Sequence, residues 1–282
     1  MGDKLAKFSK PEKPAEAGLQ HVPGANRAAL ALSPVRSGIF ARGRQDAASA
    51  SVEALYKLGV QHYNGNGMPQ DYGQAALCFR KAAEMGHTEA QYLLGTFYDS
   101  GTGVAQDYEQ AAFWDRKAAE QGHAYAQANL SFRYYAGEGL PQDFDEAFSW
   151  CHKAAESNLA WAQYNLGLMY RKGEGTDRDD AQAASWYRKA ANQGWADAQQ
   201  KLADLYYSGQ GVPLDYAQAA SWYRKAADQG NAEAQFQLGH LYGIGYGVAH
   251  DYTQARHWTR KAAQQGHEQA LRELKKREYR DP

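Results

Sequence analysis

The residues of this chain whose types and spacing could do chemistry are its histidines and its clustered carboxylates. His267 and Glu268 begin a segment that resembles the zinc-protease motif HExxH, in which two histidines one helical turn apart bind zinc and the glutamate acts as general base. Leu271 stands where the second histidine is required. The sequence therefore predicts no zinc site at this position.

A second candidate is an acidic loop that contains Glu174, Asp177, Asp179 and Asp180. A calcium-binding loop needs a glycine and a distal glutamate at fixed distances from its first carboxylates, and the sequence has neither. We interpret this cluster as a solvated loop.

Other catalytic signatures are missing from the sequence. It contains no GxxxxGK[ST] phosphate loop and no GxSxG nucleophile elbow. The glycines between Gly243 and Gly247 follow no predicted strand, as those of a dinucleotide-binding fingerprint would. We therefore expect a protein that is not an enzyme and that has no metal and no cofactor.

The histidines share a period with the rest of the chain. His87, His123 and His267 are separated by multiples of 36 residues. At the same interval a Lys-Ala-Ala triplet begins at Lys81, Lys117, Lys153, Lys189, Lys225 and Lys261. An unbroken period of this length indicates stacked supersecondary units. Alignment on the triplet gives six units, at residues 52–87, 88–123, 124–159, 160–195, 196–231 and 232–267.

Each unit encodes two helices. In the second copy, apolar residues such as Leu94 and Tyr98 recur at helical spacing until Gly101 and Gly103 end the first helix. The second helix begins in every copy with an Asp followed three residues later by Gln or Glu, a capping box that contributes about 1 kcal/mol. It ends at a glycine or, in the third copy, at Asn158, which also tolerates the left-handed conformation.

These patterns predict an all-α fold: a right-handed α-solenoid of six helix-turn-helix repeats followed by a C-terminal capping helix. Residues 1–51 contain prolines and lysines without a period, and we expect a flexible, mildly basic tail in which Ala25–Leu32 could dock on the array. Residues 268–282 repeat only the first half of a unit before becoming charged, which predicts a solvated end cap.

Composition limits the partners and the compartment. The net charge of -1, from 31 basic and 32 acidic residues, implies no attraction to nucleic acid or to anionic membranes. No run of about 18 apolar residues occurs, and polar residues follow Phe8 where a signal peptide would be apolar. We expect no membrane insertion and a cytoplasmic protein, although a different start site would leave a periplasmic location open. Cys78 and Cys151 lie two repeats apart, too far for a disulfide.

The order of residues within a unit resembles the Sel-one-like repeat (SLR), a relative of the tetratricopeptide repeat. The shared pattern is Ala-x-x-x-Leu-Gly-x-x-Tyr, Gly-x-Gly, Asp-Tyr-x-x-Ala, Trp-Tyr-x-Lys-Ala-Ala and Gly-His, from residue 52 to about residue 274. Ser131 and Ala203 replace the first-helix glycine in copies three and five. The resemblance implies adaptors and scaffolds that hold partners and, in bacteria, also virulence factors, envelope-associated proteins and immunity proteins.

Positions that vary between copies are free to specialise for a partner. On the first helix, varying residues at i, i+3 and i+7 share a face, such as Gln237, His240 and Ile244 in copy six. Related arrays present this helix on their concave side. Copies three and four place amide and aromatic groups there, which suit a peptide backbone, although ordinary exposed residues are the alternative. The predicted partner-binding residues are Asn129, Phe132, Tyr135, Asn165, Leu168, Arg171 and Lys172.

A second candidate surface lies at the junctions between copies. Four of the six junctions have His or Asn, and after His87 and Asn231 an acidic residue follows two positions later. Copies three and four depart from this rule and predict an apolar patch that a partner or the Ala25–Leu32 segment contacts, with partial burial as the alternative. The patch consists of Tyr125, Leu159, Trp161 and Trp195.

The sequence thus predicts a non-catalytic scaffold or adaptor that binds a peptide or protein partner on the concave first-helix face. One alternative is a bacterial immunity protein that occludes a toxic enzyme. A second alternative is an envelope-associated hydrolase, which no residue pattern in the sequence supports. The oligomeric state and the identity of the partner are not specified by the sequence.

Overall fold

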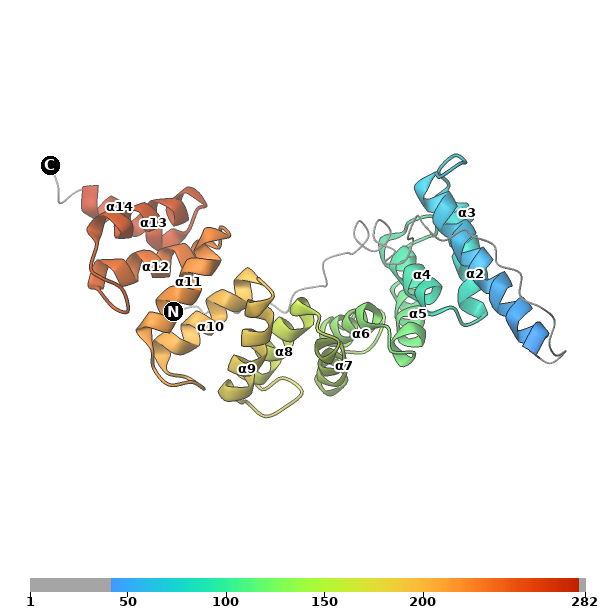
Figure 1. Cartoon of the computed structure of the whole chain (residues 1–282), viewed down its shortest axis with the longest axis horizontal. Helices are drawn as coiled ribbons and strands as arrows, with labels where there is room; N and C mark the ends of the chain where they lie inside the picture. The colour runs from blue at the N-terminus through green and yellow to red at the C-terminus, as the bar shows by residue number, and fades with distance from the viewer. Residues whose placement is uncertain (1–41, 279–282) are drawn as a thin grey trace. The chain divides into compact units, whose positions relative to one another are not determined.

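The computed structural model describes residues 42–278, and every regular element in this range is an α-helix (Figure 1). Helix α2 begins at Arg42, within the predicted tail, because the alanine-rich stretch before residue 52 favours helix. The remainder of the tail, with Ala25–Leu32, lies outside the described residues. The helices are α2 (Arg42–Asn64), α3 (Tyr72–Glu84), α4 (Thr88–Ser100), α5 (Tyr108–Glu120), α6 (Ala124–Ala136), α7 (Phe144–Glu156), α8 (Ala160–Lys172), α9 (Asp180–Asn192), α10 (Ala196–Ser208), α11 (Tyr216–Asp228), α12 (Ala232–Ile244), α13 (Tyr252–Gln264) and α14 (Glu268–Glu278).

The described chain consists of two compact units. The N-terminal unit contains α2 to α6 and ends at Asp143, and the C-terminal unit begins at Phe144 and contains α7 to α14. The two helices of copy three therefore belong to different units. Within each unit, a first helix packs against the second helix of its own repeat and against that of the preceding repeat.

Small residues let these helices approach one another closely. In the C-terminal unit, Ala183, Ala190 and Ala198 are fully buried in one cluster with Tyr187 and Leu202. Alanines at these positions leave room for the large side chains of the facing helix, which fill the seam between repeats. The core of this unit therefore consists of successive clusters between neighbouring repeats and has no single centre.

The predicted helix starts and stops are confirmed. In five copies the aspartate before the second helix accepts hydrogen bonds from backbone N–H groups two or three residues later, at 2.8–3.0 Å. These aspartates are Asp71, Asp107, Asp179, Asp215 and Asp251. Asn158 has a φ of 63°, the left-handed conformation expected where it replaces glycine.

The loops between helices fit tightly onto the preceding repeat. A Cβ atom added to Gly247, the second glycine of its loop, would lie 2.1 Å from the carbonyl oxygen of Tyr216. A Cβ atom added to the second loop glycine of copies two to five would lie 2.0–2.2 Å from a backbone carbonyl oxygen. Gly230, at a helix end, also has a positive φ, but a Cβ there would have no neighbour within 4 Å. Glycine is therefore required for space in the loops and only for conformation at the helix end.

The periodic histidines cap helices and join neighbouring repeats. The Nδ1 atom of His267 accepts a hydrogen bond from the backbone N–H of Ala270 at 3.3 Å, and its Nε2 lies 3.0 Å from Glu233. Its ring stacks on Phe236 with centroids 4.8 Å apart. His87 and His123 make the same three kinds of contact at their own junctions. One side chain thus caps a helix and joins two repeats.

The junction at Glu233 predicts a specific pH dependence of stability. Burial alone would raise the pKa of Glu233, but hydrogen bonds from His267 and Gln237 outweigh it and hold that pKa below its ordinary value of 4.5. A carboxylate with a lowered pKa contributes stability above its unfolded-state pKa and loses it as the pH falls through the folded-state value. In urea denaturation, the free energy of unfolding of Glu233→Gln should fall less than that of the wild type between about pH 5 and about pH 3.

The matched control for this prediction is Glu120→Gln, which changes an exposed glutamate and should reproduce the wild-type pH profile. A Glu233→Gln profile parallel to that of the wild type would show that the junction carries no acid-sensitive stability.

Candidate protein-binding site

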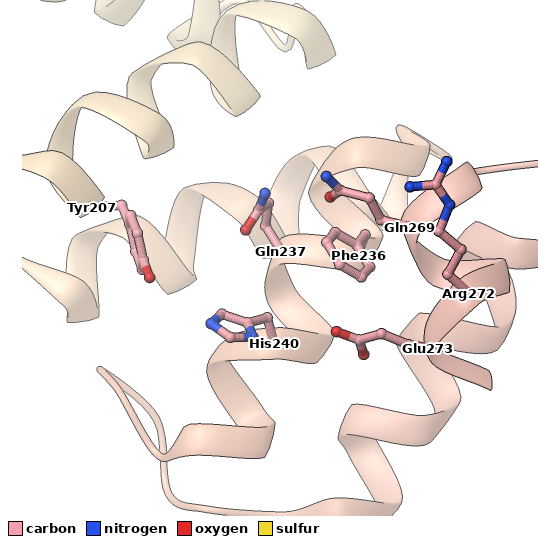
Figure 2. A pocket seen from close by; sticks show the side chains of 7 residues that line it. All are labelled: Tyr207, Phe236, Gln237, His240, Gln269, Arg272 and Glu273. Atoms are coloured by element: carbon pink, nitrogen blue, oxygen red, sulfur yellow. The ribbon is translucent and has the colours of Figure 1, made fainter. Parts of the chain in front are cut away.

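The described residues form a pocket on the face that the first helices of the C-terminal unit present together. Its volume is about 390 Å³, and three consecutive first helices, α10, α12 and α14, contribute to its walls. The lining residues are Tyr207, Phe236, Gln237, His240, Gln269, Arg272 and Glu273 (Figure 2).

Helical periodicity brings these side chains together. Phe236, Gln237 and His240 lie at i, i+1 and i+4 of α12, and the three residues from α14 have the spacing i, i+3 and i+4, so each set occupies one face. Phe236 is almost completely buried, and its stacking on His267 fixes its ring. Tyr207 comes from the last turn of α10. The pocket therefore combines an aromatic base with a polar rim.

The charged side chains of the pocket are oriented differently. Figure 2 shows the Glu273 carboxylate extending across the pocket toward His240, whereas the Arg272 guanidinium is turned away at the rim. Arg272 lies 3.7 Å from Glu268 and is mostly exposed. Gln237 uses its Nε2 group to donate a 2.8 Å hydrogen bond to Glu233. The amide oxygen of Gln237 is therefore left to accept a hydrogen bond from an occupant.

A row of tyrosines continues from the pocket. Tyr207 contacts Tyr216 with ring centroids 5.4 Å apart, and Tyr216 contacts Tyr246 at 4.8 Å. We call these three residues the tyrosine row. Tyr246 is 47 % exposed and stands between the two glycines of the copy-six loop. The other copies have Asn66, Thr102, Glu138, Glu174 and Gln210 at this position. The sequence interpretation missed this aromatic surface, although the departure of Tyr246 from the other copies was its visible signal.

The predicted residues of the N-terminal unit lie on α6. Asn129, Phe132 and Tyr135 are half-buried. The amide of Asn129 donates a 3.2 Å hydrogen bond to Asp115, so it supports an interior carboxylate. Tyr125, from the predicted patch, is exposed in this unit.

The predicted residues of the C-terminal unit lie on α8, and two of them are interior. Asn165 is fully buried and Leu168 is 3 % exposed, so the expectation that they face a partner is wrong. Leu168 belongs to the same core cluster as Tyr187 and Leu202, where burial of its apolar surface is favourable.

The remaining two predicted residues of this unit, Arg171 and Lys172, are half-buried near the end of α8. Arg171 donates a 3.1 Å hydrogen bond to Gln210, and Lys172 lies 3.4 Å from Glu174. Both therefore remain within reach of solvent.

The predicted apolar patch is not an exposed surface in the C-terminal unit. Trp161 is 8 % exposed, and Leu159 and Trp195 are half-buried, as the alternative of partial burial proposed. Leu159 and Trp195 stand where other copies have a capping His or Asn, and neither provides a side-chain cap. Trp195 instead packs toward Tyr164, with ring centroids 6.4 Å apart. Apolar packing has replaced the polar junction here.

A buried ion pair joins copies two and three. The Nε atom of Arg133 lies 2.8 Å from Asp115, and its NH2 group lies 3.2 Å from Asp99. Arg133 is 2 % exposed and Asp115 is fully buried. Burial raises the pKa of Asp115, opposed by the charge of Arg133. Burial also disfavours the charge of Arg133, but the two carboxylates raise its pKa, so the guanidinium stays charged.

The same two positions are filled differently in the other copies. In place of Arg133 they have Gln61, Phe97, Met169, Leu205 and Leu241. In place of Asp115 they have Phe79, Cys151, Tyr187, Tyr223 and Thr259. Both members of the ion pair are therefore charged at positions where the other copies have uncharged and mostly apolar residues.

Another carboxylate, Asp204 on α10, is half-buried. It accepts hydrogen bonds from the Tyr223 hydroxyl at 2.7 Å and from Gln200 at 2.6 Å. Burial raises the pKa of Asp204, and the nearby Lys201 counteracts only part of that effect. The hydrogen bond from Tyr223 links α10 to α11.

Between residues 42 and 278, no three His, Cys, Asp or Glu side chains are grouped so that they could hold a metal ion. No helix in the described part of the chain combines the length and apolar character needed to cross a membrane.

The repeated helix pairs define an α-solenoid. The Sel1 repeat pattern matches residues 52–87, 88–123, 124–159, 162–195, 196–231 and 232–267. The chain belongs to the Sel1 repeat family.

Solved structures agree with this assignment. A protective antigen of uropathogenic Escherichia coli with an SLR fold, c5321, is 39 % identical with a TM-score of 0.75; the match covers 83 % of this chain and 50 % of that protein. The chain therefore spans half the length of this relative. A Sel1 repeat protein from Oxalobacter formigenes is 35 % identical with a TM-score of 0.67, covering 82 % of this chain and 67 % of the other. No curated protein matches the chain.

An immunity protein, Pa5087 from Pseudomonas aeruginosa, is also similar. It is 22 % identical with a TM-score of 0.39, and the match covers 83 % of this chain and 84 % of that protein. A likeness of this degree carries no argument about function.

Proposed function

We propose that this chain is a non-catalytic scaffold that binds a peptide segment of a partner protein on the face formed by its first helices. The observation that carries the proposal is the pocket across α10, α12 and α14. Sel1 repeats are consistent with a role in protein interaction. An adaptor needs a recessed site of this kind on a rigid array, and a volume of about 390 Å³ suits one or two side chains.

The chemistry of the pocket supports a peptide as its occupant. Gln237 and Gln269 carry amide groups that can pair with a peptide backbone, and Phe236 and Tyr207 provide apolar surface for a side chain. The exposed Tyr246 adds contact area beyond the pocket at low entropic cost. A partner segment could therefore extend along the tyrosine row.

The proposal extends to equivalent positions in other copies. Tyr135 and Arg171 occupy, in copies three and four, the position that Tyr207 occupies in copy five. Phe132 and Lys172 lie beside them on the same helices. We assign these four side chains to the first-helix faces of their own units as further contacts for a partner.

Site-specific crosslinking tests the proposal. With the photoreactive residue p-benzoylphenylalanine in place of Tyr207, a discrete crosslinked species should form in cells of the source organism. The same residue in place of Ser221, exposed on α11, should give none. Adding Gln237→Ala and His240→Ala should lower the Tyr207 yield about 10-fold, since they remove pocket contacts without burying new groups. Equal yields at Tyr207 and Ser221 would refute binding on the first-helix face.

A further inference from the structure

We infer that the first helix of the array, α2, has an open face that binds a segment of the same chain, Ala25–Leu32, as a short capping helix. The open face consists of Ala54 and Leu58, and we call it the α2 end face. It belongs to the N-terminal unit and is not part of the pocket described above.

In later copies the second helix of the preceding repeat covers the residues equivalent to the α2 end face. These residues are an alanine and, four positions later, a leucine. Ala198 and Leu202 of α10 lie in one cluster with alanines of α9. Ala234 and Leu238 of α12 lie in another cluster with alanines of α11. The residues at these two positions in copies two to six are all fully buried: Ala90, Leu94, Ala126, Leu130, Ala162, Leu166, Ala198, Leu202, Ala234 and Leu238.

On α2 the same two positions are open to solvent. Leu58 is 37 % exposed, and Ala54 is also exposed. No helix precedes α2 in the described part of the chain, so no described second helix covers this face. Repeat arrays need terminal units that shield their ends from solvent, and at the C-terminal end the charged helix α14 has this role. The α2 end face therefore needs a cover of its own.

The sequence of Ala25–Leu32 suits such a cover. It reads ANRAALAL, whose alanine, arginine and leucine residues favour helix, and Pro34 follows shortly after its end. The residues at i, i+3, i+4 and i+7 share one side of a helix, and here they are Ala25, Ala28, Ala29 and Leu32. We call these four residues the alanine face. Alanines of second helices pack against Leu202 and Leu238 in the same way elsewhere in the array.

The length of chain between the segment and α2 allows this contact. Nine residues, 33–41, separate Leu32 from Arg42, where α2 begins. Fully extended, they span up to about 30 Å, whereas Arg42 and Leu58 are about 24 Å apart along the helix. The segment can therefore lie antiparallel to α2. A short tether keeps it at a millimolar effective concentration, which favours it over a second copy of the chain in dilute solution.

Photocrosslinking in the purified full chain tests this contact. With p-benzoylphenylalanine in place of Leu58, irradiation should join residue 58 to the tryptic peptide 28–36, in a product that migrates as a single chain. The same residue in place of Glu84, exposed on α3, should give no such product. Ala29→Asp should lower the yield at Leu58 about 10-fold or more, because docking would bury a carboxylate. The matched control Asn26→Asp adds the same charge outside the alanine face and should retain the wild-type yield.

The alternative occupants give different products. A product that migrates as a dimer and joins residue 58 to a second chain would show that another copy covers the α2 end face, and would overturn the inference. Equal yields in Ala29→Asp and Asn26→Asp, or the absence of any product that contains residues 28–36, would show that the segment does not dock there. The crosslinking yield at Tyr207 tests the proposed function independently.

Discussion

Replacing Arg133 with methionine should lower the free energy of unfolding by about 3–5 kcal/mol, because it leaves Asp115 buried without its partner. Methionine is the residue at the equivalent position in copy four, where Met169 is fully buried, so the side chain itself fits the seam between repeats. The loss would therefore come from the uncompensated charge. Urea denaturation followed by circular dichroism measures it.

The double variant Asp115→Cys with Arg133→Met tests this explanation. It reproduces the apolar pair Cys151 and Met169, so most of the lost stability should return even though one more polar group has been removed. Arg116→Met, an exposed change on α5, should cost no more than about 1 kcal/mol. If the double variant is as unstable as the sum of both single changes, the two residues do not act as a pair.

The Gly247→Ala variant should lose about 3 kcal/mol or more of folding stability. Two costs combine in this variant. A residue with a side chain at a φ of +71° costs about 1–2 kcal/mol, and the new Cβ would lie 2.1 Å from the Tyr216 carbonyl oxygen, so the loop and α11 must separate. Thermal unfolding should occur at a clearly lower temperature than in the wild type.

Gly230→Ala is the matched control for the steric part of this effect. Its φ of +94° imposes a conformational cost, but no atom lies within 4 Å of the added Cβ. It should therefore lose only about 1–2 kcal/mol. Equal losses in the two variants would show that backbone conformation alone makes glycine necessary in the loops.

The fold was predictable from the sequence because its determinants are local and repeated. The cap at Asp107 and the glycine at Gly101 each act within a few residues, and their recurrence at 36-residue intervals removes the ambiguity of any single motif. Asn158 is informative because it deviates in identity yet adopts the same backbone conformation. The start of α2 was missed, since the helix extends beyond the repeated pattern.

The candidate site was only partly predictable. The prediction that varying residues at i, i+3 and i+7 of a first helix share a face included Gln237 and His240. Both residues line the pocket, because residues at this spacing lie on one side of a helix. It also included Leu168, which is buried although Asp204, at the same position in the next copy, is partly exposed. Position within a helix does not specify exposure, which depends on the particular side chains of the facing helices.

Contacts between copies were the least predictable part of the site. Tyr207 and Tyr246 come from different repeats, and the pocket also requires α14, which belongs to the capping half-repeat. The Arg133 and Asp115 pair was detectable by comparing copies, because each residue is charged where its counterparts are uncharged. A comparison that considers pairs of neighbouring positions would have found both features.

The buried ion pair has a consequence for how nearly identical repeats find their correct neighbours while folding. Second helices such as α9 and α11 have almost the same sequence, so incorrect pairing between copies would cost little in apolar packing. Placing α6 against any second helix other than α5 would bury the Arg133 charge without Asp115. That penalty distinguishes this junction from the others. It disfavours incorrect pairing of α6, and the correct α5–α6 pair then sets the order in which the remaining repeats stack.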